Sequence, residues 1–432
     1  MSAPPAKKLT IRQAAFIGVG SMVGAGIFSL LGAAGEVAGA AVWLSFMIAG
    51  AIAMLQGYSF AKFGARYPSA AGLLEYVSRG FGEGHITGIV AWLLFAANAL
   101  ITAMVAVSFG SYAASAISRG DSAWIKFFAV LVLCAMTSLN IMGSQAVARA
   151  QTVVVYVVIG ILTVFAIATL ANIQPDLLAF SHYPPFRDIV SSVALTFFAF
   201  LGFGVITFTA NSLANPSHDL PRAMYIALGI ATVIYIAVAL GVFGTLTVEK
   251  VISSGGTAIA VAAEPVLGSA GFHLMTVTAL FATAGATNAG LYPAAGLSEQ
   301  MAAKGQFPPL LGLRVGGRAA AGLLITAGAA IVLALGFDLT AIASIGSAIA
   351  LLVFALVTGA HLTLRKETGA STLLLVLAIV STVGVLLTFI FTTLIHEPAA
   401  AFTLLGILLL SVALDMGWKR VRKARLGEPR TA

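Results

Sequence analysis

The sequence predicts an all-α polytopic membrane protein, and three observations lead to this prediction. First, 60% of the 432 residues are hydrophobic and only 9% are charged, which gives a mean hydropathy of +1.03. Second, the apolar residues gather in twelve segments of about 20 residues, the length that an α-helix needs to cross about 30 Å of hydrocarbon. Third, the basic residues are concentrated in alternate loops. This composition excludes a soluble globular domain.

The twelve expected transmembrane helices follow one another along the chain. Their approximate extents are residues 12–33, 39–60, 86–115, 124–142, 150–172, 188–211, 223–246, 270–298, 319–336, 339–363, 371–394 and 399–417. A polar run from Lys62 to His85 separates the second and third segments. An amphipathic stretch from Thr247 to Ser269 separates the seventh and eighth, and we expect it to form a short helix on the outer surface.

The distribution of basic residues predicts the topology. If the N-terminus is cytoplasmic, 19 of the 23 lysine and arginine residues fall on the cytoplasmic side. Only Arg119, Lys126, Arg187 and Lys250 fall on the other side. Because cytoplasmic loops carry an excess of Lys and Arg, this asymmetry predicts that both termini are cytoplasmic and that the number of spans is even. We therefore expect a multi-pass protein of the cytoplasmic (inner) membrane.

The net charge of +8 does not indicate nucleic-acid binding, because the basic run from Lys419 to Arg425 directly follows the last span. Such a run is typical of a positive-inside anchor that can touch anionic lipid headgroups. The single cysteine, Cys134, excludes an internal disulfide and has no metal-site spacing. The first apolar segment lacks a convincing cleavage site, so we expect no cleavable signal peptide.

The first span contains an unusual concentration of glycine. Gly18, Gly20, Gly24 and Gly26 fall within nine residues, with Ser21 among them. Glycine inside a helix costs about 1 kcal/mol relative to alanine, so this density favours a broken helix. A break at membrane depth exposes backbone N–H and C=O groups that can bind a ligand, and the half-helix N-terminus attracts a carboxylate. The alternative is a close-packing seam for a neighbouring helix. A dinucleotide-binding loop is excluded because the spacing is not G-x-G-x-x-G.

The sixth span is interrupted in the same way. Gly202 and Gly204 lie at its middle among aromatic residues, and Asn211, Asn215 and Pro216 follow at its cytoplasmic end. The first and sixth spans occupy corresponding places in two five-helix halves. Glycine-interrupted spans in matching positions point to a transport site near the bilayer midplane. The alternative is that the glycines only let phenylalanine side chains pack.

These features divide the chain into five parts. We expect a cytoplasmic N-terminus at residues 1–11, a first five-helix repeat at 12–172 and a second at 188–363. Helices 11 and 12 occupy 371–417, and a basic cytoplasmic tail occupies 418–432.

Six stretches occur in a characteristic order over nearly the whole chain. They are Gly18–Phe28, Ala65–Tyr76 (ARYPSAAGLLEY), Phe198–Gly204, Asn215–Arg222, Ser298–Pro308 (SEQMAAKGQFP) and Ala343–Gly346. Together they resemble the motifs of the amino acid–polyamine–organocation (APC) permeases. The resemblance implies an inverted five-plus-five repeat with broken helices 1 and 6, followed by two extra helices.

The resemblance also implies which residues bind the substrate. Backbone groups around Ser21, Met22, Val23, Gly24, Ala25, Gly26 and Ile27 should bind the α-carboxylate of an amino acid. Carbonyl groups near Phe200, Leu201 and Gly202 should bind its α-amine. Phe200, Phe203, Gly204 and neighbours on helices 3, 8 and 10 should contact its side chain.

The chain departs from the family pattern at three positions. Gly204 stands where many relatives carry a carboxylate, and Glu299 stands where relatives carry an arginine at the end of helix 8. Val158 stands where some relatives carry a lysine that serves in coupling. Its absence argues against proton coupling through that lysine.

The ionisable residues of the spans all lie near predicted ends, namely Glu36, Asp338, His361 and Asp415. A charge at the bilayer centre would cost about 2.5–3.5 kcal/mol and would be read as functional. Since no carboxylate faces the gap, the sequence favours a substrate with a neutral side chain.

Four polar residues are candidate contacts for an ion or the substrate, namely Asn98, Thr283, Thr287 and Asn288. Hydroxyl groups of helix 8 that face the break in helix 1 could coordinate Na⁺. The alternative for all four is an interhelical hydrogen bond.

Taken together, the residues and the resemblance predict secondary active transport of neutral amino acids with small to medium side chains, by alternating access and with proton-coupled uptake. Na⁺ is the less favoured coupling ion, and we expect no metal or cofactor. The protein is expected to be a monomer or a weak homo-oligomer in contact with membrane lipid, and not an enzyme. An amino acid or amine exchanger and a transport-inactive sensor of the same fold remain as alternatives.

Overall fold

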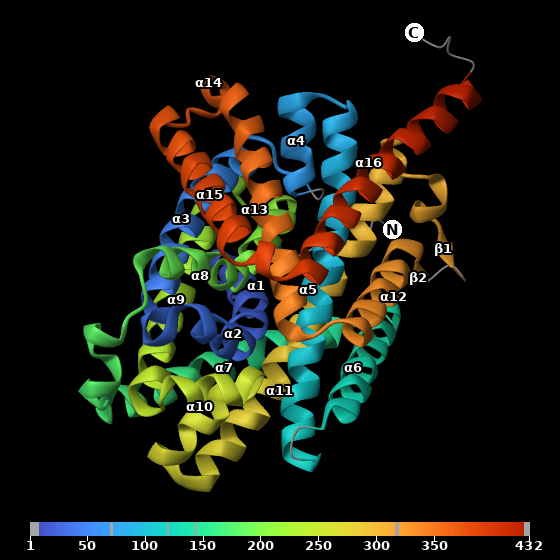
Figure 1. The fold of residues 1–432 in the computed structure, drawn as a ribbon. Coiled ribbons are helices and arrows are strands. Elements are labelled where there is room, and N and C mark those ends of the chain that lie inside the picture. Colours follow the sequence, from blue (N-terminus) through green and yellow to red (C-terminus); the bar gives the residue numbers. More distant parts are fainter. Residues whose placement is uncertain (1–7, 70–71, 119–120, 143–144, 316–318, 427–432) are drawn as a thin grey trace.

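The computed structural model describes residues 8–69, 72–118, 121–142, 145–315 and 319–426, which form an almost entirely helical bundle (Figure 1). The α-helices are α1 (Ile11–Ala25), α2 (Ile27–Ala38), α3 (Val42–Arg66), α4 (Leu73–Phe81), α5 (His85–Ser118), α6 (Ser122–Met142), α7 (Gln145–Ala171), α8 (Phe186–Phe198), α9 (Pro216–Thr245), α10 (Val248–Ser254), α11 (Ala258–Ala303), α12 (Ala321–Gly336), α13 (Leu339–Thr363), α14 (Arg365–Thr368), α15 (Thr372–Thr392) and α16 (Pro398–Leu426). The 3₁₀ helices are η1 (Gly39–Ala41), η2 (Pro175–Leu178), η3 (Phe180–His182), η4 (Leu201–Ser212), η5 (Gly255–Thr257), η6 (Pro309–Gly312) and η7 (Leu394–His396). Strands β1 (Arg314–Val315) and β2 (Ala319–Ala320) pair antiparallel, with Arg314 opposite Ala320.

The helices confirm an all-α polytopic membrane fold. Within the described residues, ten helical segments are long and apolar enough to cross a membrane. Helix length alone does not establish the predicted number of twelve, for two reasons. The first predicted span is divided into α1, of 15 residues, and α2, of 12 residues, and the ninth corresponds to α12, of only 16 residues. Twelve spans and the inverted repeat therefore stay predictions.

Basic residues gather at one end of the bundle, namely Arg79 in α4, Arg365 and Lys366 in α14, and Lys419, Arg420 and Arg422 in α16. Helices α4 and α14 and the last turns of α16 lie at one end, which we call the basic end, and α10 lies at the other (Figure 1). The 29 residues of α16 rise about 43 Å at 1.5 Å per residue, so this helix continues past its neighbours at the basic end. That the basic end is cytoplasmic stays a prediction.

The stretch between the seventh and eighth predicted spans is helical, as expected. It forms α10, η5 and the first turns of α11. Gly268 interrupts α11 with a positive φ of 69° and separates these first turns from the long apolar part of the helix. Large apolar side chains are exposed along α6, α7 and α15, which is the arrangement expected for surfaces in contact with lipid.

Polar side chains join α3, α13 and α15 inside the bundle. The amide of Gln56 donates to Thr382 Oγ1 at 2.7 Å, and its carbonyl oxygen accepts from Thr358. Ser59 Oγ lies 2.9 Å from His361 Nδ1. All five side chains are buried, and each hydrogen bond replaces one that water would otherwise supply.

Two ionisable residues that the sequence places near span ends do lie there, but they are buried rather than solvated. His361 is fully buried in the last turn of α13, where its Nε2 lies 2.8 Å from Thr368 Oγ1. Asp415 is fully buried on α16, where it pairs with His85 and Lys419. Hydrogen-bonded partners at each site explain why burial is tolerated.

The Gln56 hydrogen bonds should stabilise the contact of α3 with α13 and α15. We expect Gln56→Leu to lower the Tm by several degrees, because it leaves the Thr358 and Thr382 hydroxyl groups without their partner at a cost of about 1–2 kcal/mol. The measurement is thermal unfolding of the purified protein in detergent. Ser381→Ala is the matched control, since the hydrogen bond that the Ser381 hydroxyl makes within the described part of the chain goes to Ala378 O of its own helix. Equal Tm values for both variants and the parent protein would contradict this role.

Candidate substrate site

The first helix is interrupted at Gly26, as the glycine pattern predicts. Thr10 caps the start of α1 by accepting a hydrogen bond from the Gln13 backbone N–H. Gly26 ends α1 and precedes α2, and its N–H still donates to Met22 O at 3.2 Å. A methyl group at this position would overlap Ala199, so the close approach of α8 requires glycine.

The sixth helix changes its type rather than unwinding. α8 ends at Phe198, and after Ala199 and Phe200 the chain continues as η4 through 12 residues. A 3₁₀ helix longer than three or four residues is uncommon and often marks a functional hinge. The hydroxyl of Tyr235 donates to Ala199 O at 3.1 Å, which satisfies one backbone carbonyl at the change.

The two interrupted helices touch through their backbones. A methyl group at Gly202 would lie 2.5 Å from the carbonyl carbon of Ser21 and 2.6 Å from the Met22 nitrogen, closer than side chains approach. The structure therefore brings together the predicted carboxylate-binding and amine-binding segments. Of these residues, Ser21, Met22, Val23, Gly24 and Ala25 lie in α1, Gly26 at the break, Ile27 in α2, Phe200 before η4, and Leu201, Gly202, Phe203 and Gly204 in η4.

The aromatic residues of this region are core residues. Phe200 is fully buried against Tyr235, with ring centroids 5.0 Å apart. Phe203 is also fully buried and packs on Phe60 and Phe354, each at 5.4 Å. Phe200 therefore packs the start of η4 against α9, and Phe203 packs it against α3 and α13.

A cavity of about 80 Å³ lies beside η4. Its walls come from α4, α5, η4, α11 and α13, and they are Leu73, Leu94, Ala97, Asn98, Ile101, Leu201, Gly204, Val205, Phe208, Leu297, Ala350, Val353 and Phe354. No charged residue lines it. A methyl group at Gly204 would lie 3.6 Å from Leu73, so glycine leaves open space on the cavity side. Leu201, Gly204 and Asn98 are the predicted site residues that line this cavity.

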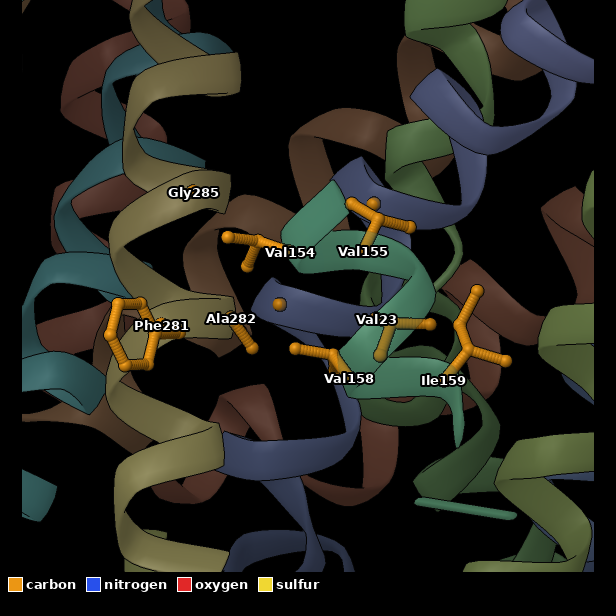
Figure 2. Close-up of a pocket in the computed structure, with 10 residues that line it drawn as sticks. Val23, Val154, Val155, Val158, Ile159, Phe281, Ala282 and Gly285 are labelled. Atoms are coloured by element: carbon orange, nitrogen blue, oxygen red, sulfur yellow. The ribbon is translucent and has the colours of Figure 1, made fainter. Parts of the chain in front are cut away.

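A second, much smaller pocket of about 10 Å³ lies between α1, α7 and α11 (Figure 2). Val158 and Ala282 point toward each other across it, and Gly20, Val23 and Gly24 complete the side that α1 forms. No lining side chain carries an oxygen or nitrogen atom. The position where some APC permeases have a coupling lysine is thus filled by a buried valine in an apolar pocket that barely admits one water.

The four polar candidates have different environments. Thr283 and Thr287 bond back to carbonyl groups of their own helix, at 2.6 and 2.9 Å. Asn288 accepts from Asn140 Nδ2 at 2.7 Å, which is an interhelical hydrogen bond between α11 and α6. Asn98 differs, because its amide nitrogen is buried and has no hydrogen-bond partner within the described residues. It is the polar candidate that could still donate to a ligand.

Sequence reasoning did not identify most of the cavity walls. Leu73, Leu94, Val205, Leu297 and Val353 come from five elements far apart in the sequence. They are apolar residues in an apolar chain, so no local signal separates them from residues that face lipid. Only their meeting in space shows that they line a cavity.

Comparisons with known proteins agree with this architecture. The family model described as "Amino acid permease" matches residues 9–413. The inner membrane transport protein YbaT of Escherichia coli is 31% identical over 416 residues, which cover 96% of this chain and 97% of YbaT. An uncharacterized protein of Methanocaldococcus jannaschii is 32% identical, with 88% of each chain covered. The branched-chain amino acid permease BcaP of Bacillus subtilis is 24% identical over 52% of this chain and 51% of its own length.

The family match runs through the two interrupted helices and through every residue that lines the cavity beside η4. With this coverage, the resemblance in the motifs is confirmed. The chain belongs to the amino acid permease family of the APC superfamily, a family of membrane transporters.

Proposed function

We propose that the protein carries amino acids with neutral, small to medium side chains across the cytoplasmic membrane by alternating access. The observation that supports this proposal most strongly is the direct contact of the two interrupted helices at Gly202, Ser21 and Met22, next to an uncharged cavity. Separating the two segments would free backbone groups to bind an α-carboxylate and an α-amine. The name of BcaP is consistent with a neutral amino acid as substrate.

The polarity of the cavity supports a neutral side chain. A cationic or anionic side chain would lose its hydration in the cavity without gaining a partner of opposite charge. Asn98 can offer one hydrogen bond, and the other walls offer apolar contact. Phe203 behind the hinge adds to this apolar environment. A cationic amino acid or an amine would need a carboxylate that these walls do not provide.

Proton-coupled uptake is the mode we propose, with exchange as the alternative. The apolar pocket at Val158 supports neither a Na⁺ site nor a titrating lysine there, because its side chains offer no ligand. A coupling proton would therefore have to bind elsewhere.

The direct test of transport is counterflow in proteoliposomes. Vesicles are loaded with a mixture of neutral L-amino acids, and one labelled member is added outside. We expect transient accumulation of label, which a channel or a transport-inactive sensor would not give. Arginine and putrescine serve as cationic controls and should not support counterflow. Failure of every neutral amino acid would contradict the proposal.

Coupling can be tested in the same vesicles. We expect an inward proton gradient to increase the initial rate of uptake, whereas an inward Na⁺ gradient should leave it unchanged. Counterflow that responds to neither gradient would instead indicate an exchanger or a facilitator. Stimulation by Na⁺ would show that the pocket at Val158 does not represent the ion-binding conformation.

The glycine contact makes a prediction of its own. Gly202→Ala should reduce transport at least tenfold, since the added methyl group stops η4 and α1 from returning to close contact in each transport cycle, and such overpacking costs about 1–3 kcal/mol. The initial rate of counterflow is the measurement. Gly160→Ala is the matched control, because Gly160 in α7 has open space around its Cα. Normal transport by the Gly202 variant would mean that the close contact is not needed.

A further inference from the structure

Helix α4, which lies at the basic end of the bundle (Figure 1), contributes to the wall of the cavity beside η4. The apolar side of this short helix is buried, with Leu73, Leu74, Tyr76 and Val77 at most 4% exposed. Leu73, the first residue of α4, is itself part of the cavity wall. α4 contacts α13 and α5, which also contribute to the cavity wall, so a movement of the first turn of α4 would displace the wall at Leu73.

The two ends of α4 are held by different contacts. Near its C-terminal end, Gln306 donates to Glu83 O at 3.2 Å and Thr363 donates to Gly80 O at 3.3 Å. These bonds connect backbone groups to α13 and to the segment after α11. In the first turn, the side chain of Glu75 forms an ion pair with Lys304. The part of α4 that lines the cavity is thus fastened by an ion pair, whereas the other end is fastened through its backbone.

The position of Lys304, which forms the pair with Glu75, is fixed by the chain around it. It directly follows α11, the helix that contributes Leu297 to the cavity wall. The next residue, Gly305, is fixed to α16, since Trp418 Nε1 and Arg422 Nη1 both donate to its carbonyl oxygen, at 2.9 and 3.2 Å. Lys304 therefore extends from an anchored segment toward α4.

The Glu75 carboxylate is charged at neutral pH. Burial alone would raise its pKa, but the hydrogen bonds from Lys304 and Arg79 lower the pKa overall. A lowered pKa means that the carboxylate is ionised above its ordinary pKa and that the pair is lost only as the pH falls into the acid range. The side chain is 12% exposed and that of Lys304 is 31% exposed, so the pair is partly shielded from water.

We propose that α4 is a gate for the cavity and that the Glu75–Lys304 ion pair is its latch. Breaking the pair lets the first turn of α4 swing away from η4 about its anchored C-terminal end and opens the cavity to the basic end. This inference rests on the proposed transport function, because a gate is useful only if substrate passes through the cavity.

The experiment measures access to the cavity with a thiol reagent. Cys134→Ser removes the single native cysteine, and Leu297→Cys places a reporter thiol in the cavity wall. The full-length protein in lipid nanodiscs is treated with a maleimide, and the labelling rate is measured. We expect Glu75→Gln and Lys304→Gln each to increase this rate about two- to fivefold, in line with the strength of a partly exposed ion pair.

Two further variants show whether the pair itself is responsible. The double variant Glu75→Gln/Lys304→Gln should label no faster than either single variant, since both remove the same interaction. Lys304→Arg should keep the slow rate of the parent. Glu299→Gln is the matched control, because it breaks the Glu299–Arg314 pair at the same end of α11 without touching α4.

Unchanged labelling in both single variants would overturn the proposal, and so would an equal increase in Glu299→Gln, which would indicate general loosening. The labelling assay needs no substrate. A parent protein that shows no counterflow would therefore contradict the proposed function without deciding the gate, and normal counterflow with unchanged labelling would contradict only the gate.

Discussion

The contact of Gly202 with the backbone of Ser21 and Met22 is the constraint on which the rest of the site depends. It lets α1 and η4 meet with no side chain between them, and Gly26 does the same where α2 begins beside Ala199. The two interrupted helices thereby meet backbone to backbone at Gly202, and the buried side chain of Ile206 in η4 packs on Gly18 of α1. Alternating access requires an interface between such elements that has two arrangements.

Much of this arrangement could be predicted from the sequence. The glycines of the first and sixth spans lie where α1 ends and where η4 begins, and composition predicted the membrane fold. The form of the second interruption could not be predicted, because nothing in residues 201–212 distinguishes a long 3₁₀ helix from an α-helix. The residues that line the cavity could not be identified from the sequence either, since a leucine such as Leu73 or a valine such as Val353 is typical of any apolar segment. Asn288 was a candidate contact for an ion or the substrate. In the structure it accepts a hydrogen bond from Asn140 of another helix, and this pairing could not be predicted from the sequence.

The polar groups of the bundle fall into two kinds. Gln56, Thr358 and Thr382 bond to one another and join helices. Asn98 has a buried amide nitrogen that lacks a partner within the described residues, and it lies in the wall of the cavity. Satisfied groups are explained by stability alone, whereas an unsatisfied donor beside a cavity is free to bind a ligand or an ordered water. By the same reasoning, the side chains around Val158 offer no ligand for an ion, because all of them are apolar.

The central claim is that α1 and η4 together form an amino acid site, and direct binding tests it without requiring transport. The Tm of the purified protein would be measured with alanine, valine, leucine, isoleucine, threonine and phenylalanine over a range of concentrations. A ligand at about 100 times its Kd should stabilise the protein by about 2.7 kcal/mol, a shift of several degrees. We expect at least one neutral amino acid to raise the Tm saturably in the parent protein and not in Gly202→Ala. Equal shifts in both proteins, or none in the parent, would contradict the account.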